Sequence, residues 1–235
     1  MSLKELRERV YEANMDLVRK NLVISTWGNV SGYDEESGLM LIKPSGVHYD
    51  ELRPEMIVPV NMDGEVVDST YVPSTDTKTH IEIYKAFKDK GVRGVIHTHS
   101  TFATIWSQLG RDIPAYGTTH VDYYFGDIPC TRALTTEEIE EDYEKNTGKV
   151  ILERFANMDP IEMQAVLVRH HAPFCWGKSP EQAVLHAEVL EQVAKMAIFN
   201  FMATGGTLPN VPDNIKQKHY SRKFGPNAYY GQAKP

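Results

Sequence analysis

The sequence is poor in cysteine and has neither an excess of positive charge nor a long apolar run. Its two cysteines, Cys130 and Cys175, are too few for a disulfide framework. No apolar stretch approaches the ~20 residues of a membrane-spanning helix, and the first residues form a charged amphipathic segment, not a signal peptide. The formal net charge of -7 argues against nucleic acid or an anionic membrane surface as the main partner. We therefore expect a cytoplasmic protein that binds neither, although a local group of donors can still bind a small anion.

The chain also lacks repeats, low-complexity tracts and any linker that would divide it. Its 235 residues suffice for one large domain, so we expect a single domain over residues 1–235. Neither a dinucleotide-binding nor a Walker fingerprint is present. The nearest sequence, Asn146-Thr147-Gly148-Lys149, lacks the first glycine of a P-loop. Nothing in the sequence therefore indicates a nucleotide cofactor.

Apolar periodicity and capping residues predict alternating helices and strands. Helices are expected over residues 3–18, 76–88, 101–109, 137–155 and 179–203. The last is the clearest, because Ser179 stands at its N-cap and Gly205-Gly206 at its end. Strands are expected over residues 22–25, 40–43, 57–60, 64–67 and 165–171, with another that starts at Gly94. This order indicates a sheet covered by helices.

The strand that starts at Gly94 ends in a pair of histidines, His97 and His99. Alternate side chains of a strand share one face, so the two imidazoles point together while Thr98 points away. Two adjacent imidazoles are the geometry that a divalent metal needs from its first two ligands. Two hydrogen-bonded strand histidines are an equally good interpretation of the pair alone.

Further ligand candidates come from two other segments. The expected strand 165–171 ends in His170-His171, and because neighbouring residues face opposite ways, only one of the two can join the pair. Asp76 precedes an expected helix; a helix-capping or first-turn role is favoured from sequence alone, with a metal-ligand role as the alternative. His80 shares a helical face with Ile83 and Tyr84 and is expected to be a packing histidine.

Three short segments have the chemistry to hold an anion. Gly28-Asn29 places a flexible residue before an amide side chain. Lys43-Pro44-Ser45-Gly46 has the residues of a turn and adds a cation and a hydroxyl. Ser74-Thr75 offers hydroxyls and free N–H groups at the start of an expected helix, where the dipole favours negative charge. Each alone is more often a simple turn or cap, but together they would form a phosphate pocket.

Several motifs in this order resemble the class II aldolase/adducin family, and within it the epimerases of ketopentose phosphates. They are Thr26-Trp27-Gly28-Asn29-Val30-Ser31, Lys43-Pro44-Ser45-Gly46, Pro73-Ser74-Thr75-Asp76-Thr77, His97-Thr98-His99, Gly117-Thr118-Thr119-His120 with Asp122, Ile128-Pro129-Cys130-Thr131 and Ala228-Tyr229-Tyr230-Gly231-Gln232. The resemblance runs in register from the first helix to the tail. It implies a single-domain three-layer α/β/α sandwich with a central, mainly antiparallel sheet.

The resemblance also implies the site residues. A zinc ion, with Mn²⁺ or Co²⁺ as substitutes, would be held by Asp76, His97, His99 and His171, with His170 outside the ligand set. A phosphate group would be bound by Gly28, Asn29, Ser45, Gly46, Ser74 and Thr75, with Lys43 nearby. Asp122 and Tyr230 would be the acid/base pair. The tail, about residues 210–235, would dock on a neighbouring subunit of a homotetramer, so that the active sites lie between subunits.

Two departures from the family's common pattern stand out. Ser74-Thr75 replaces Ser-Ser before the aspartate, which keeps the hydroxyl. Arg169-His170-His171-Ala172-Pro173 stands where the family often has His-Ser-His-Gly-Pro, and the last histidine is retained.

The implied activity interconverts L-ribulose 5-phosphate and D-xylulose 5-phosphate, in arabinose or ascorbate catabolism. Because the hydrogen on C4 is not acidic, inversion there requires cleavage and re-formation of the C3–C4 bond, with the electrons held at the C2 carbonyl. Two alternatives remain open at this point. One is a class II sugar-phosphate aldolase that releases its fragments, although those relatives generally carry Glu where this chain has Asp76. The other is a non-catalytic, adducin-like module.

Overall fold

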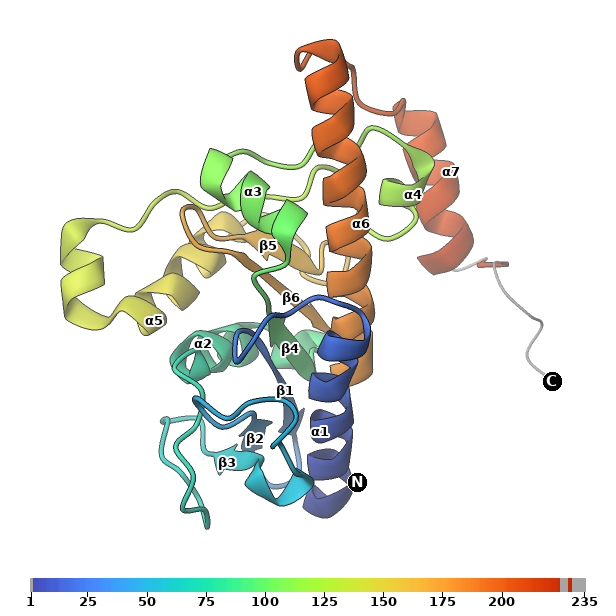
Figure 1. Ribbon diagram of the computed structural model, residues 1–235. Coiled ribbons are helices and arrows are strands. Elements are labelled where there is room, and N and C mark those ends of the chain that lie inside the picture. The colour runs from blue at the N-terminus through green and yellow to red at the C-terminus, as the bar shows by residue number, and fades with distance from the viewer. Residues whose placement is uncertain (1, 225–227, 230–235) are drawn as a thin grey trace.

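Six short strands form one sheet at the centre of the molecule, which is described by a computed structural model covering residues 2–224, 228 and 229 (Figure 1). The strands are β1 (Asn29–Asp34), β2 (Leu39–Ile42), β3 (Val58–Val60), β4 (Gly94–His97), β5 (Ala165–Leu167) and β6 (Pro173–Gly177). They lie in the order β3-β2-β1-β4-β6-β5, and each neighbouring pair is antiparallel.

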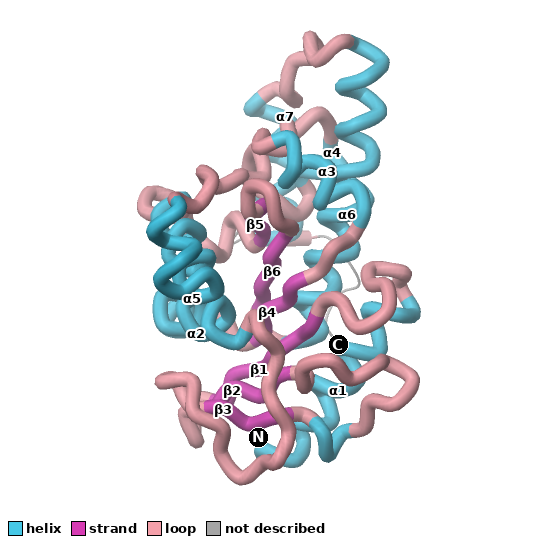
Figure 2. The backbone as a smooth tube through the Cα atoms, turned by 60° about the vertical axis from the view of Figure 1, so that its left-hand side comes forward, coloured by secondary structure: helices cyan, strands magenta, loops and turns pink. Residues whose placement is uncertain are grey.

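Helices cover both faces of this sheet. They are α1 (Leu3–Arg19), α2 (Thr77–Phe87), α3 (Thr101–Leu109), α4 (Thr118–Val121), α5 (Thr136–Arg154), α6 (Pro180–Thr204) and α7 (Asp213–Phe224), with the short 3-10 helices η1 (Pro54–Met56) and η2 (Lys88–Lys90). Figure 2 shows α2 and α5 together on one face and α1, α3 and α6 on the other. The expected three-layer α/β/α sandwich with an antiparallel sheet is therefore confirmed.

The two helices that pack most closely on the sheet follow the expected pattern. In α1, Leu6, Val10, Ala13 and Leu17 form a buried stripe, as the 3.6-residue period requires. The hydroxyl of Ser179 accepts a hydrogen bond from the Gln182 N–H and so caps α6. No helix in the described part of the chain is long and apolar enough to span a bilayer.

Gly94 brings the start of α6 against the strand that carries the histidines. A Cβ atom at this position would lie 2.3 Å from the carbonyl oxygen of Ser179, which is a backbone atom and cannot move aside. Because only glycine permits this approach, the N-terminus of α6 lies directly over β4. The position of the next strand residues, up to His97, is thereby fixed.

Two expected strands are absent. Residues 22–24 form no regular structure and Ser25 lies in a turn, because Asn21 and Ser25 adopt left-handed backbone conformations (φ 54° and 58°) that end extended structure. In 64–67 only Val66 makes a bridge, to Val60. Conversely, β1 and β6 were not expected. Both are buried along their whole length, so they do not show the alternation of polar and apolar residues that marks a half-buried strand.

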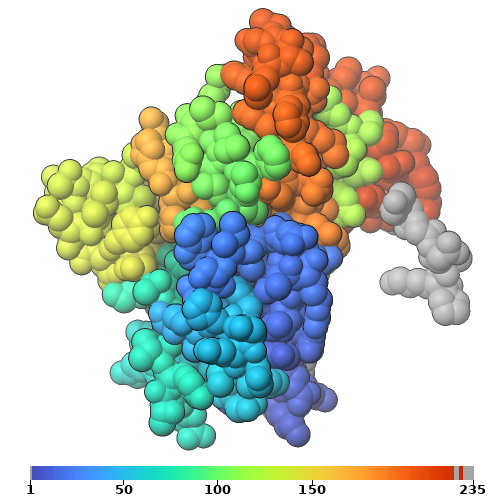
Figure 3. Space-filling view, in the orientation of Figure 1, coloured from blue at the N-terminus to red at the C-terminus, as the bar shows by residue number. Residues whose placement is uncertain are grey.

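The first part of the expected tail packs on its own chain. The Val211 N–H donates to the Ala115 carbonyl (2.8 Å), and the Asn210 amide donates to Asp127 (2.6 Å). Helix α7 then runs beside α4, on the opposite side of the molecule from α5 (Figure 3). Docking of later tail residues on a neighbouring subunit stays a prediction.

Candidate metal centre and active-site cavity

Three histidines meet where β4 ends and β6 begins. One ligand nitrogen from each of His97, His99 and His171 lies within 4.8 Å of the other two. The Nε2 atoms of His97 and His99 are 3.1 Å apart. In a tetrahedral zinc site with Zn–N bonds of ~2.0–2.1 Å, neighbouring ligand atoms are about 3.3 Å apart. The spacing of this pair therefore matches that of two ligands of one cation.

The protonation of the three rings also suits a cation. His97 Nδ1 lies 3.0 Å from the Pro173 carbonyl oxygen, which can only accept a hydrogen bond, so the proton is on Nδ1 and the lone pair of Nε2 is free. Burial lowers the pKa of His97 and of His99, and it lowers the pKa of His171 to about 4. His171 Nδ1 is buried without a hydrogen-bond partner. Neutral imidazoles and an unpaired buried nitrogen are what a divalent metal requires.

The structure separates His171 from its neighbour His170. His170 adopts a left-handed conformation (φ 64°) in the turn between β5 and β6, and its exposed ring accepts a hydrogen bond from the Arg169 side chain (3.3 Å). Because of this turn, β5 ends at Leu167 and not at His171 as expected. His171 is then directed to the other two histidines, with ring centroids 4.7 and 5.2 Å away.

Asp76 lines the same cavity but lies outside the group of three ligand nitrogens. It occupies the N-cap position of α2, yet its side chain makes no capping hydrogen bond, so the favoured capping role is wrong. Its Oδ2 atom instead accepts a hydrogen bond from the Asn29 amide (2.7 Å). Burial acts to raise the pKa of Asp76, but the neighbouring histidines and the hydrogen bond from Asn29 together lower the pKa overall, so the carboxylate is ionised.

The cavity has a volume of about 390 Å³ and brings the three expected anion-binding segments to the histidines. The expected residues that line it are Gly28, Asn29, Lys43, Ser45, Gly46, Ser74, Thr75, Asp76, His97, His99 and His171. Gly28 has φ 77°, and a Cβ atom there would lie 2.9 Å from the His97 carbonyl oxygen. Glycine thus allows the first anion-binding segment to approach the end of β4.

Lys43 adds a buried positive charge to the lining of this cavity. The residue is 2 % exposed, and its ammonium donates to the Val47 carbonyl (2.7 Å) above the Tyr49 ring. Among the described residues it forms no ion pair with a carboxylate, and burial lowers its pKa to about 8. A buried cation without a carboxylate partner is suited to an anionic ligand.

Tyr143 and Glu144 also line the cavity and were not expected from the sequence. They follow Asp142, whose non-helical conformation (φ -163°, ψ 86°) divides α5 into two parts. Asp142 pairs with Lys78 of α2 (2.8 Å), and the Thr79 hydroxyl donates to the Glu144 carbonyl (2.6 Å). Periodicity gave no signal for these residues, because the segment reads as one continuous helix.

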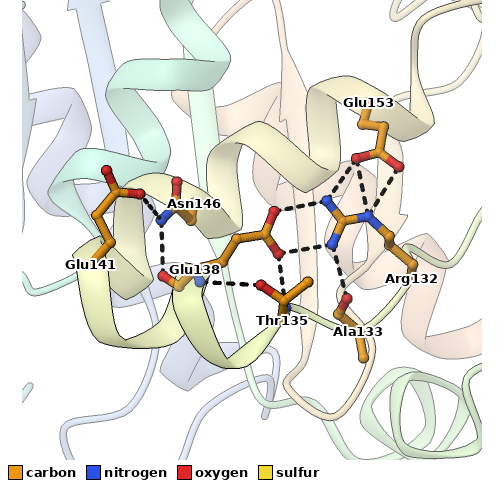
Figure 4. A network of polar contacts seen from close by, with 7 residues as sticks. All are labelled: Arg132, Ala133, Thr135, Glu138, Glu141, Asn146 and Glu153. Carbon is orange, nitrogen blue, oxygen red and sulfur yellow. Dashed lines mark hydrogen bonds and ion pairs between the residues drawn. The ribbon is translucent and has the colours of Figure 1, made fainter.

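Ion pairs hold the first part of α5 in place (Figure 4). The Arg132 guanidinium joins Glu138 in the first turn to Glu153 near the end of the helix (2.8 Å each). The Asn146 amide donates to the Glu138 carbonyl (2.8 Å) across the division. The two parts of α5 therefore keep one relative orientation, and Tyr143, which follows the division, lines the cavity.

Of the two expected acid/base residues, Asp122 does not line this cavity in the single chain. Asp122, at the end of α4, accepts hydrogen bonds from Arg222 (2.7 Å) and from His219 (3.1 Å) of α7, and it is not among the residues lining the cavity. Helices α4 and α7 lie on the side of the molecule opposite α5 (Figure 1). Tyr230 lies outside the described residues.

Comparison with known proteins agrees with this arrangement. The pattern described as "Class II Aldolase and Adducin N-terminal domain" matches residues 8–198. The chain is 51% identical over 232 residues to a protein of Salmonella paratyphi C (strain RKS4594) named L-ribulose-5-phosphate 4-epimerase UlaF, covering 98% of this chain and 100% of the relative. A relative of the same name from Salmonella typhi is 51% identical over 230 residues, with the same coverage.

Two solved structures share the fold. One is described as L-fuculose 1-phosphate aldolase, with a TM-score of 0.76 and 25% identity, covering 94% of this chain and 97% of that chain. The other is an aldolase II superfamily protein from Pseudomonas syringae, with a TM-score of 0.77 and 18% identity, covering 97% of this chain and 90% of that chain.

The adjacent histidines provide a matched test of the metal centre. Replacing His171 by Ala removes one of three clustered nitrogens. We expect zinc affinity to fall by more than the 10–100-fold that is typical when a residue hydrogen-bonded to a metal ligand is replaced. His170→Ala removes an exposed ring and is expected to leave the affinity unchanged. Competition with a chromophoric chelator measures both. Equal losses in the two variants would contradict the assignment of His171.

Proposed function

We propose that this chain, which belongs to the class II aldolase and adducin family, is a metal-dependent epimerase that interconverts L-ribulose 5-phosphate and D-xylulose 5-phosphate. The observation that carries the proposal is the joint occurrence, in one cavity, of the three-histidine cluster and the buried Lys43 ammonium. Such a cavity can bind a cation at the three histidines and a phosphate at the Lys43 ammonium. The relatives that are 51% identical over nearly the whole chain are named as epimerases of this substrate.

The chemistry requires a bond to break between C3 and C4, because the hydrogen on C4 is not acidic. When bound, a divalent cation supplies a Lewis acid that stabilises the negative charge developing on the ketose oxygens, by several kcal/mol. We assign zinc to the site, held by His97, His99 and His171 with Asp76 as the fourth ligand; imidazole and carboxylate also suit Mn²⁺ or Co²⁺.

We place the phosphate of the leaving fragment at Lys43 and the three anion-binding segments of the same cavity. Lys43 supplies charge, and Ser74 and Thr75 present hydroxyls and backbone N–H groups just before α2, where the helix dipole favours an anion. Gly28, Ser45 and Gly46 complete the pocket, and Asn29 links Ser74 to Asp76 through its amide (3.0 and 2.7 Å). With its phosphate fixed, the released aldehyde can rotate and present its other face.

Re-forming the bond on either face needs a proton donor and acceptor on each side of the C4 oxygen. We assign these roles to Asp122 and Tyr230 of a neighbouring copy, because Asp122 does not line the cavity of its own chain. The proposed assembly is a homotetramer with active sites between subunits, which agrees with the preference of oligomers for closed symmetry. We place the enzyme in the cytoplasm, in arabinose or ascorbate catabolism.

A class II sugar-phosphate aldolase is the second candidate, because a solved structure of that name shares the fold at 25% identity. One assay separates the two and also tests a non-catalytic role. The purified protein is given L-ribulose 5-phosphate with and without a chelator, and the products are resolved by NMR. We expect D-xylulose 5-phosphate, formed only when metal is present. Free glycolaldehyde phosphate as the main product would favour the aldolase, and a chain that binds no metal would favour the non-catalytic module.

Lys43 provides a test of the phosphate site. Lys43→Met is expected to raise KM about 10- to 100-fold, because a hydrogen bond to a charged group contributes about 1.5–3 kcal/mol. Since burial lowers the pKa of Lys43 to about 8, the ammonium loses its proton above that pH, and wild-type kcat/KM should fall there. The variant should lack this fall. Lys88→Met, which removes a lysine over the Tyr33 ring outside the cavity, is the matched control. A pH profile identical in wild type and Lys43→Met would contradict the phosphate role.

Mixed assemblies test the proposed contribution of a neighbouring copy. Asp122→Asn and Tyr230→Phe should each lower kcat about 10²- to 10⁴-fold, the range for general acid–base groups, while metal stoichiometry is unchanged. His99→Asn should lose metal. Hybrids of Asp122→Asn and His99→Asn subunits, isolated with two affinity tags, should recover activity. In such a hybrid, some active sites combine the histidines of an Asp122→Asn subunit with the Asp122 of a His99→Asn subunit. If Asp122 served its own chain, no hybrid would recover.

A further inference from the structure

His80 is a buried histidine that the proposed reaction does not use. Its side chain lies on α2, is 0 % exposed, and its Nε2 atom is buried without a hydrogen-bond partner. Burial lowers its pKa to about 3, so the ring is neutral and carries one proton. A buried polar atom without a partner is rare in native proteins and calls for an explanation.

A chain of two hydroxyls decides which nitrogen carries this proton. The Tyr84 hydroxyl lies 2.9 Å from Ser31 Oγ, which lies 2.8 Å from His80 Nδ1. Burial raises the pKa of Tyr84, so the phenol is protonated. Its hydroxyl also has a hydrogen bond with the Val95 backbone, which acts to lower this pKa and therefore comes from an N–H donor, so the phenol proton is left to donate to Ser31. The Ser31 hydroxyl then donates to Nδ1. The proton of His80 is therefore on Nε2, the unpartnered atom.

His80 lies directly behind the metal centre. It is four residues after Asp76, so both side chains lie on one face of α2, and the His80 N–H donates to the Asp76 carbonyl (3.0 Å). The His80 ring also meets the Phe174 ring edge to face, with centroids 5.9 Å apart. Phe174 in turn stacks on the His97 ring (4.3 Å) and meets the His171 ring (6.3 Å). Among the charged groups that act on His80, the Asp76 carboxylate, proposed as the fourth ligand, is the one that acts to raise its pKa.

We propose that His80 is a positioning residue whose Nε2–H, oriented by Tyr84 and Ser31, donates to the Asp76 carboxylate when a divalent cation occupies the three-histidine cluster. Donors behind a ligating carboxylate hold it toward the cation and raise metal affinity. In the structure the Asp76 carboxylate accepts a hydrogen bond from Asn29, and the Nε2 atom of His80 has no acceptor. This inference rests on the proposed function only for the place of Asp76 in the ligand set.

Two substitutions separate the two nitrogens of the ring. The terminal atoms of Asn overlay Nδ1, whereas those of Gln reach the place of Nε2. In metal-stripped, full-length protein titrated with Zn²⁺ against a chromophoric chelator, we expect His80→Asn to lower affinity about 10- to 100-fold and His80→Gln to stay within about threefold of wild type. His186→Asn is the matched control, since His186 is also buried, with Nδ1 bound to the Trp176 carbonyl (2.6 Å) away from the cavity. Equal effects of His80→Asn and His80→Gln would overturn the proposal.

A double-mutant cycle shows whether His80 acts through Asp76. In an Asp76→Asn background, His80→Asn should cost no further zinc affinity; independent losses that multiply would overturn the role of His80. Should His80→Asn fail to fold, Ser31→Ala removes the orienting hydroxyl, and its smaller loss must likewise vanish without the carboxylate. Because the readout is metal affinity, a wild-type protein that binds zinc but does not epimerise the pentose phosphate would refute the proposed function and leave this test standing.

Discussion

The hydrogen bond between His97 Nδ1 and the Pro173 carbonyl is the contact on which the site depends. It crosses the β4–β6 pair at the place where His97 lies opposite Phe174. The bond fixes the tautomer of His97 and directs its Nε2 lone pair to His99, 3.1 Å away. The same pairing sets the position of the turn before Pro173, and with it His171. The register of the β4–β6 pair thus determines where the three ligand nitrogens lie.

The sequence was most informative about the histidines that follow buried strands. Strand alternation predicted that His97 and His99 point together and that only one of His170 and His171 joins them, and the resemblance to the family assigned His171. In the structure a left-handed backbone at His170, which periodicity does not predict, separates the two rings. The resemblance to a family supplied the phosphate residues, all of which line the cavity. Periodicity missed β1 and β6, since strands buried on both faces lack alternation.

Other features were beyond the sequence because they depend on contacts between distant segments. The division of α5 at Asp142 is stabilised by Lys78 of another helix, and it is this division that directs Tyr143 and Glu144 to the cavity. Asp122 was expected at the reaction centre, yet in one chain it is paired with α7 and lies apart from the histidines. In the assembly we propose, a second copy supplies this residue, and the pattern of one chain cannot place it there.

The electrostatics of the cavity explain why such a site needs its ligands. Burial lowers the pKa values of the three histidines and of Lys43. Without a ligand, each positive charge in the cavity therefore carries an uncompensated desolvation cost. Three of the five buried side-chain atoms without partners in the described part of the chain belong to Asn29, His80 and His171, at or behind this cavity. In the function we propose, a cation pairs with the free nitrogens of the three clustered histidines and a phosphate pairs with the Lys43 ammonium. Unpaired polar atoms scattered through a core would only destabilise it; gathered around one cavity, they are groups that a bound ligand can satisfy.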